Sequence, residues 1–243
     1  MRIASLVTRA LGVPAIVLAA AGLPARAGPA AAQDTRPGIA VLAFDNGGSY
    51  GKDKEDFEAL RRGIAGTMIY ELSQNPAARL VERTETQRIL DEQGLAVAER
   101  VDAATAAKVG KLVGARYMIT GSFMDMFGDF RLDARIINVE TGEIMKVVRN
   151  DPKLHDRRDI YKIIQSVAEQ IMAGTKLPPL PTDVAQRAQA RQVPTEALAF
   201  FSRALLYQDR GDKAKAIDYY QKALEVFPEY TEASEGLKRV RGS

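Results

Sequence analysis

The block from Val101 to Phe123, VDAATAAKVGKLVGARYMITGSF, constrains the fold more than any other part of this chain. Asp102 is placed as an N-cap, because its carboxylate can accept a hydrogen bond from an unpaired backbone N–H of the alanine-rich helix that follows. Gly114 stands where that helix should end, since glycine enters the left-handed conformation without steric cost. The apolar run from Ala115 to Phe123 is typical of a buried strand. A capped helix followed directly by a buried strand predicts an α/β fold.

The amino terminus predicts a secretory signal peptide. Arg2 and Arg9 precede an apolar run from Leu11 to Leu23, which is shorter than the roughly 20 residues that span a bilayer. Small residues allow cleavage after Ala27 or after Ala32. A mitochondrial transit peptide is the alternative, because the stretch has arginines and no acids, but its apolar run is too continuous for an amphipathic face. We therefore expect an exported protein.

Composition excludes several classes of function. The formal net charge is +3, and loss of the signal peptide would remove Arg2, Arg9 and Arg26 and bring it to zero. Nucleic-acid binding needs a dense basic patch that neutralises phosphates, so no nucleic acid is expected as a partner. The chain has no cysteine, which excludes disulfides, thiolate metal sites and a lipid-bearing cysteine. Nothing after the leader resembles a membrane anchor, so no integral membrane span is expected.

Hydrophobic patterning from Gly38 onward predicts helices packed on a mixed sheet. Ile39–Phe44 is a continuous apolar run, typical of a strand covered on both faces. A loop is expected over Asp45–Gly51, and an apolar stripe predicts a helix from about Asp53 to Ser73. Within that helix Gly63 and Gly66 cost roughly 1 kcal/mol each relative to alanine, so close backbone packing is the expected compensation.

The remaining elements of this domain complete a β-α-β-α-α-β-β-β-α order, which predicts a three-layer-like α/β sandwich. They are a strand at Arg79–Glu82, a helix at Thr84–Gln93 stopped by Gly94, a turn region at Met124–Asp129, strands at Phe130–Glu140 and Glu143–Arg149, and a helix from Ile160 to near Gly174. Proline-bounded residues 176–194 are expected to form a stiff, partly helical linker.

Residues 197–230 resemble a single tetratricopeptide repeat. Bulky, small and aromatic residues recur at the positions that such a hairpin uses: Phe200, Ala204, Tyr207, Gly211, Asp212, Ala216, Tyr220, Ala223 and Pro228. Arg203 departs from the usual leucine, which puts the inner packing of the first helix in doubt. A third helix, with a polar side that faces solvent, is expected over Thr231–Arg241. The tripeptide Arg210-Gly211-Asp212 is interpreted as the turn of the repeat.

Five blocks between residues 38 and 175 together resemble the CsgG family. They are IAVLAFDN at 39–46, LVER at 80–83, ILDEQGL at 89–95, VDAATAAKVGKLVGARYMITGS at 101–122 and INVETGEI at 137–144. The resemblance implies a CsgG/TolB amino-terminal-like fold and a bacterial envelope protein, located in the periplasm of a Gram-negative bacterium or peripheral to its outer membrane. Unlike channel members of the family, this sequence lacks the lipoprotein cysteine and long insertions for membrane hairpins. We therefore expect that it does not form the pore.

Catalytic and cofactor chemistry finds little support in the sequence. Gly110-Lys111 is followed by Leu112 instead of Ser or Thr, so a phosphate-binding loop is not predicted. His155 is the only histidine, whereas zinc sites want three or four clustered ligands. No cofactor or metal is expected, and no nucleophile has a defensible histidine partner. An envelope hydrolase that uses Asp125 or Asp129 is a further hypothesis, beside the two non-enzymatic functions given below.

The expected domains are a signal peptide at 1–27, a tether at 28–37, a CsgG-like domain at 38–175, a linker at 176–194 and the repeat hairpin with a trailing helix at 195–241. Leu198, Phe201 and Leu205 form a stripe distinct from the repeat's packing positions, with Gln208 and Asp209 beside it. These residues either bind a partner or dock on the preceding domain, and docking is the favoured interpretation.

The sequence therefore predicts a non-enzymatic exported protein that acts as a protein-binding adaptor in secretion or envelope assembly. Its expected partners are envelope or secreted proteins, with a homo-oligomer as a further candidate. The alternative is a soluble, ring-forming component of a curli-like secretion channel.

Overall fold

A mixed sheet organises the fold. The structure is a computed structural model that describes residues 34–49, 54–95 and 101–242. The signal peptide expected at 1–27 and most of the tether expected at 28–37 lie outside the described residues. All the elements below belong to the unit from Arg36 to Ser243.

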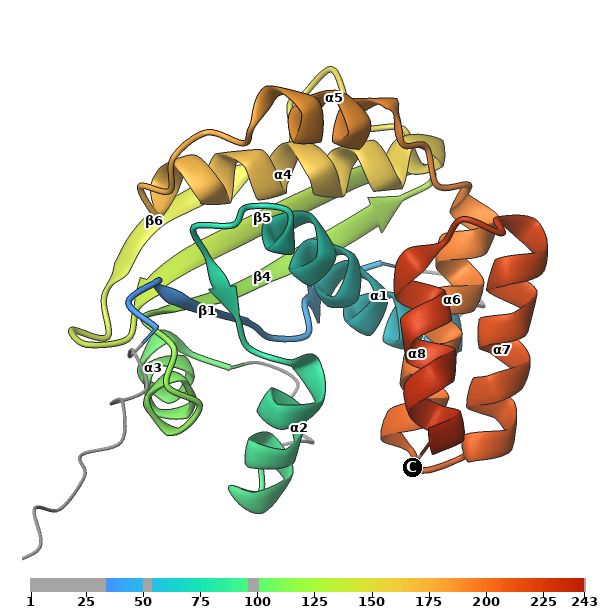
Figure 1. Ribbon diagram of the computed structural model, residues 1–243, viewed down its shortest axis with the longest axis horizontal. Coiled ribbons are helices and arrows are strands. Elements are labelled where there is room, and N and C mark those ends of the chain that lie inside the picture. The colour runs from blue at the N-terminus through green and yellow to red at the C-terminus, as the bar shows by residue number, and fades with distance from the viewer. Residues whose placement is uncertain (1–33, 50–53, 96–100, 243) are drawn as a thin grey trace, which may run out of the picture. The chain divides into compact units, whose positions relative to one another are not determined.

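Parallel and antiparallel pairing meet at the central strand of the sheet, as Figure 1 shows. The described strands are β1 (Gly38–Val41), β2 (Asp45–Asn46), β3 (Arg79–Leu80), β4 (Tyr117–Met126), β5 (Asp129–Asn138) and β6 (Ile144–Arg149). Their order is β3-β1-β4-β5-β6, with β2 also paired to β4. β1 is parallel to β3 and β4, whereas β5 is antiparallel to both of its neighbours. The predicted mixed sheet is confirmed.

Helices follow the predicted order. They are α1 (Lys54–Ser73), α2 (Arg83–Glu92), α3 (Ala103–Leu112), a 3-10 turn η1 (Arg157–Asp159), α4 (Ile160–Gly174), α5 (Thr182–Ala190), α6 (Thr195–Asp209), α7 (Lys213–Val226) and α8 (Thr231–Gly242). Asp102 caps α3 by accepting a hydrogen bond from Thr105 N at 2.7 Å, and Gly114 has φ +65° just beyond the helix. No helix in the described ranges is long and apolar enough to cross a bilayer.

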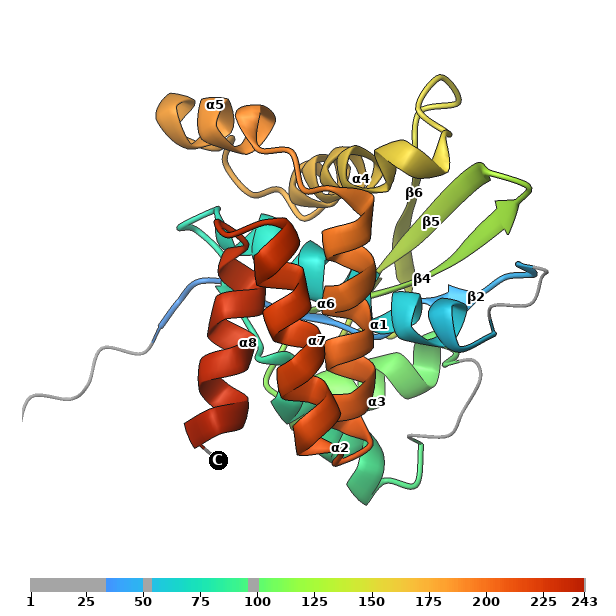
Figure 2. The same cartoon turned by 90° about the vertical axis from the view of Figure 1, so that its right-hand side faces the viewer.

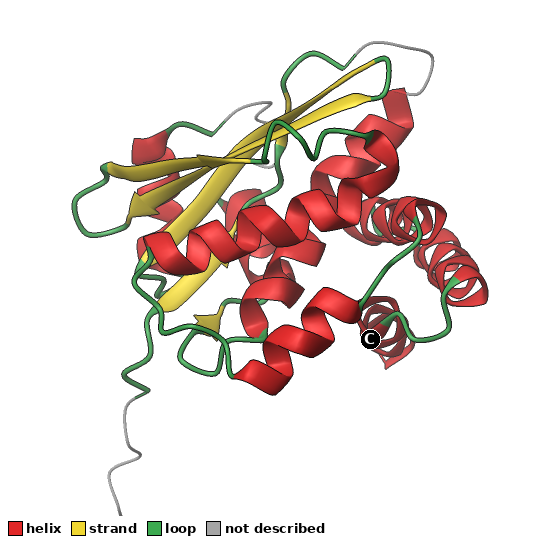
Figure 3. Ribbon diagram, turned by 90° about the horizontal axis from the view of Figure 1, so that it is seen from above, coloured by secondary structure: helices red, strands yellow, loops and turns green. Residues whose placement is uncertain are grey.

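The two faces of the sheet carry different helices, as Figures 1 and 3 show from two directions. On one face Ile39, Ile119 and their neighbours pack in a cluster with α1, α4 and the helices from α6 onward. On the other face Ala40 and Met118 pack with α2 and α3. The strand at Ile39–Phe44 was predicted to be covered on both faces, and the residues of β1 are all buried.

The hairpin between β4 and β5 is longer than the sequence suggests. A turn region was expected over Met124–Asp129, but β4 continues to Met126 and only Phe127 and Gly128 separate the strands. Both turn residues have positive φ, 59° and 96°, as in the type I′ turn that matches strand twist. The sequence does not predict this turn, because asparagine or glycine usually occupies the position of Phe127.

The loop expected at Asp45–Gly51 also contains a strand. Asp45 and Asn46 pair in parallel with Ser122 and Phe123 as β2. Polar residues gave no strand pattern there, because the pairing is supplied by the long neighbour β4 and not by local propensity.

Candidate protein-binding site: the repeat hairpin and its seam with α1

The repeat forms an antiparallel helical hairpin followed by α8. Ala204 of α6 and Ala216, Tyr220 and Ala223 of α7 are buried between these helices. Gly211 turns the chain with φ +75°, and Asp212 caps α7 by accepting a hydrogen bond from Lys215 N at 3.1 Å. The Arg-Gly-Asp tripeptide is therefore the turn of the hairpin, as predicted. Figure 2 shows α6 lying between α7 and the α/β elements.

Helix α6 packs directly on α1. Leu198, Phe201 and Leu205 are at most 3% exposed, and a methyl group added to Gly66 would contact Phe201 and Leu205. A methyl group on Gly63 would overlap Ser202 Oγ. The close approach that the two glycines predicted is confirmed, and the segment that approaches is the repeat's first helix.

Ion pairs line the same contact and form what we call the charged seam. Asp209 accepts hydrogen bonds from Arg62 Nε and Arg83 Nη1, both at 2.8 Å, and its side chain is 9% exposed. At the other end of the seam, Arg203 Nε donates to Asp56 Oδ1 at 2.7 Å. The arginine that replaces the usual leucine therefore serves the contact with α1.

The five residues proposed as a binding surface all have partners inside the chain. Leu198, Phe201 and Leu205 are buried against α1, Gln208 accepts a hydrogen bond from Tyr220 Oη at 2.6 Å, and Asp209 belongs to the charged seam. This placement agrees with the favoured docking interpretation. In this arrangement the apolar stripe offers no open surface to a partner.

A second polar cluster ties the linker to α1, α4 and α8. We call it the Arg191 cage. Arg191 lies over the rings of Tyr70, Tyr161 and Tyr230, with its Cζ 4.2 Å from the Tyr70 centroid. Its Nη2 donates to Glu232 Oε2 at 2.5 Å. Aromatic faces attract a guanidinium electrostatically, and the attraction is stronger away from water.

Two carboxylates share this single cation. Glu71 lies 3.9 Å from Arg191 Nη1 and accepts a hydrogen bond from Tyr161 Oη at 2.5 Å. Burial raises the pKa of Glu71 and outweighs the hydrogen bond from Tyr161. Burial also raises the pKa of Glu232, although the paired Arg191 opposes it. Glu71 and Glu232 therefore keep a proton to higher pH in the folded protein than free carboxyl groups do.

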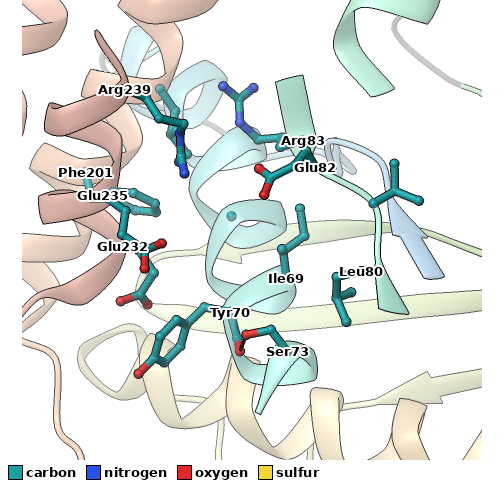
Figure 4. Close-up of a pocket in the computed structure, with 13 residues that line it drawn as sticks. Ile69, Tyr70, Ser73, Leu80, Glu82, Arg83, Phe201, Glu232, Glu235 and Arg239 are labelled. Carbon is teal, nitrogen blue, oxygen red and sulfur yellow. Dashed lines mark hydrogen bonds between the residues drawn. The ribbon is translucent and has the colours of Figure 1, made fainter. Parts of the chain in front are cut away.

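A cavity of about 160 Å³ opens between α1, the start of α2 and α8, and Figure 4 shows its lining. Ile69 and Tyr70 of α1 face Glu232, Glu235 and Arg239 of α8 across it. Glu82 and Arg83 line the cavity at the start of α2. The cavity is small, and acidic and basic side chains from α2 and α8 line it. These side chains stay apart and form no acid–base pair.

No pattern in the sequence predicts the Arg191 cage or this cavity. Arg191 belongs to a polar stretch that predicts only a linker, and Tyr70 and Glu232 lie on helices far apart in the chain. No local spacing links residues that only tertiary packing brings together. The Arg and Glu side chains also lie among many other charged residues, so composition does not single them out.

The residues considered for chemistry support the fold of the β4–β5 turn. Asp125 accepts a hydrogen bond from Gly128 N at 2.9 Å and pairs with Arg157 Nε at 3.2 Å. His155 Nδ1 is 3.4 Å from Asp129 Oδ1. Across the described ranges, no three His, Asp or Glu side chains gather as a metal site requires. The absence of enzymatic activity stays a prediction.

Two family models match the chain. The model described as "Curli production assembly/transport component CsgG" matches residues 25–126, and the tetratricopeptide repeat model matches residues 197–230. The resemblance and the order of the two modules are confirmed. The block INVETGEI at 137–144 lies beyond the end of the CsgG match. No curated protein matches the sequence significantly.

Several solved structures are similar to parts of the chain. The carboxy-terminal domain of LpoB from Salmonella enterica is 22% identical, covers 46% of this chain and 79% of its own, and has a TM-score of 0.32. For TolB from Acinetobacter baumannii these values are 13%, 70%, 31% and 0.33. For a PelC dodecamer from Paraburkholderia phytofirmans they are 11%, 59%, 90% and 0.33.

Proposed function

We propose that this chain is a non-enzymatic protein of the Gram-negative periplasm that binds other proteins as an adaptor in secretion or cell-envelope assembly. The observation that carries the proposal is the pairing of a CsgG match at 25–126 with a tetratricopeptide repeat at 197–230. Repeats of this type work through contacts between helical faces and extended surfaces. The expected signal peptide supports export.

Packing of the repeat supports an adaptor that acts as one body. The face of α6 that carries Leu198 and Leu205 is filled by α1, and the charged seam joins the hairpin to α1 and α2. A partner would therefore bind a surface formed by the CsgG-like part, the outer sides of α7 and α8, or both. Little ordering would be needed on this side of the complex, which favours affinity.

Crosslinking in intact cells tests the proposal. A photoreactive amino acid is placed singly at the exposed positions Val147 on β6, Glu225 on α7 and Lys238 on α8, with exposed Arg187 on α5 as the control site. We expect one or more of the first three positions to capture the same envelope or secreted protein repeatedly, and the control to capture none. Failure at every position would contradict the adaptor function.

Location and assembly are measured on the same strain. Periplasmic extraction should release a protein whose intact mass corresponds to cleavage after Ala27 or Ala32. Light scattering on this purified protein separates an adaptor that exists as a single copy from a ring of many copies. A closed ring would favour the secretion-channel alternative, and retention in the cytoplasm would contradict export.

A further inference from the structure

Strand β6 leaves one side of the sheet open. It is the last strand in the order β3-β1-β4-β5-β6, and within the described ranges its ladder partner is β5 alone. Ile144, Met145 and Val147 are 47%, 41% and 46% exposed, and Val148 is the only buried residue of the strand. An exposed edge with apolar side chains is a template for pairing with another strand.

Among the described residues, much of the sheet face beside this edge carries no helix. Helix α3 packs on Met118, Ile137 and Val139, and the β4–β5 hairpin extends well beyond it in Figures 1 and 2. Pairing places Val147 opposite Arg135 and Arg149 opposite Asp133 on that part of the sheet, where Arg135 and Asp133 are half-buried. An incoming strand would therefore meet an edge and a face that continue into each other.

Positive charge dominates the edge. Strand β6 contains Lys146 and Arg149 and no acid. Arg149 pairs with Asp133 at 2.8 Å, whereas Arg131, Arg135 and Lys146 make no ion pair with any described residue. Opposite charges placed across neighbouring strands stabilise the pairing, and like charges destabilise it.

This charge pattern distinguishes between possible occupants. If β6 paired with β6 of a second copy, Lys146 and Arg149 of both chains would be brought together along the new ladder. Lysine on an edge strand is a common device against such self-association. Acidic side chains on one face of an incoming strand would instead find Lys146, whereas Arg135 and Arg149 lie on the other face with Val147. The edge therefore favours a partner of opposite charge over a second copy.

We propose that the β6 edge binds an extended acidic segment of a partner protein as an added antiparallel or parallel strand. Main-chain hydrogen bonds would give affinity, and alternate side chains would give specificity. Acidic residues would lie near Lys146, and apolar residues would cover Ile144 and Val147. The added strand would end before Arg149, because Gln170 Nε2 of α4 already donates to its carbonyl at 2.7 Å. This inference rests on the proposed adaptor function.

The probe is a short synthetic peptide that alternates valine and glutamate, compared with the same peptide carrying lysine in place of glutamate. Binding to the purified protein is followed by fluorescence anisotropy and by backbone hydrogen exchange. We expect the acidic peptide to bind, the lysine peptide to bind more weakly, and the amides of residues 144–148 to gain protection. Lys146→Glu should weaken binding of the acidic peptide about fivefold.

A matched charge reversal gives the control. Lys238→Glu on α8 changes the net charge equally and lies at an exposed position away from the sheet, so its affinity for the peptide should equal that of the unmodified protein. The proposal is overturned if no peptide binds, if both peptides bind equally, if protection appears away from β6, or if β6 is protected by self-association before peptide is added. Partners captured in cells without peptide binding at β6 would reject this site and leave the adaptor function standing.

Discussion

At the scale of single residues, Gly63 sets how closely the repeat hairpin can approach α1. Ser202 Oγ occupies the space that a side chain at Gly63 would need, and this hydroxyl donates to Leu198 O at 2.7 Å. Glycine weakens an isolated helix, so its presence in mid-helix is explained by packing and not by propensity. The position couples two modules that are distant in sequence.

We predict that Gly63→Ala lowers the free energy of unfolding by about 1–3 kcal/mol, because the added methyl group overpacks the contact. Urea unfolding followed by circular dichroism measures the change. Adding Ser202→Gly should restore much of the loss, since the two changes act on one contact. Equal destabilisation by Gly63→Ala with and without Ser202→Gly would reject this account.

The Arg191 cage gives stability a definite dependence on pH. Burial raises the pKa of Glu71 in the folded protein above its value in the unfolded chain. The folded state therefore holds more protons than the unfolded state between these two pKa values, and stability contributed by this group falls as pH rises through that range. Below the unfolded pKa of Glu71 the contribution is fully present.

Glu71→Gln should remove that part of the pH dependence, because the amide keeps an acceptor for Tyr161 and carries no charge. We expect the variant to gain stability relative to the unmodified protein as pH rises above the pKa that Glu71 has in the unfolded chain. Urea titrations across that range measure the difference. A difference that stays constant with pH would show that Glu71 does not titrate as inferred.

At the scale of elements, the charged seam fixes the register of α6 on α1. Asp209 at the end of α6 binds Arg62 in the middle of α1 and Arg83 at the start of α2, and Arg203 binds Asp56 in the first turn of α1. Each pair joins α6 to another element, so a shift of α6 along its axis would break all three pairs at once. Apolar packing alone would tolerate such a shift more easily.

Asp209→Asn tests the seam. We predict a loss of about 3 kcal/mol in unfolding free energy, because the change takes the paired carboxylate from the largely buried Arg83 and leaves Arg62 with Glu58 alone. Urea unfolding measures it. Asp218→Asn is the control, since its ion pair with Lys222 is 56% and 43% exposed and should be worth at most about 1 kcal/mol. Comparable losses in both variants would contradict a special role for the seam.

At the scale of the whole described unit, one apolar cluster extends from the sheet through α1 and α4 into the repeat hairpin. It includes Ile119 of β4, Ile64 of α1, Ile164 of α4 and Tyr220 of α7. A single repeat cannot bury its own apolar face, and here the preceding domain completes that burial. The domain boundaries expected at 175 and 195 stay a prediction.

This shared core predicts that the hairpin and the sheet unfold together. In native-state hydrogen exchange, the slowest amides of α6 and β4 should open with the same free energy, because neither core survives without the other. Amides of α5 should exchange earlier, since that helix has no buried residue. Slow exchange in β4 combined with fast exchange throughout α6 would show that the hairpin opens independently.

Local signals in the sequence determined much of the secondary structure. Asp102 and Gly114 bounded α3 correctly, and the repeat motif located α6 and α7, because caps, turns and helical stripes depend on residues close in sequence. The glycines of α1 even predicted a close contact. The exposed Phe127 and the polar β2 were missed, because their conformations come from pairing with β4.

Tertiary structure alone decided which surfaces meet. The sequence left the stripe at Leu198, Phe201 and Leu205 open to a partner or to the chain itself, and packing placed it on α1. It gave no sign of the Arg191 cage or of the open β6 edge. Spacing along the chain records which side chains share a face, whereas the burial of that face depends on elements that only folding brings together.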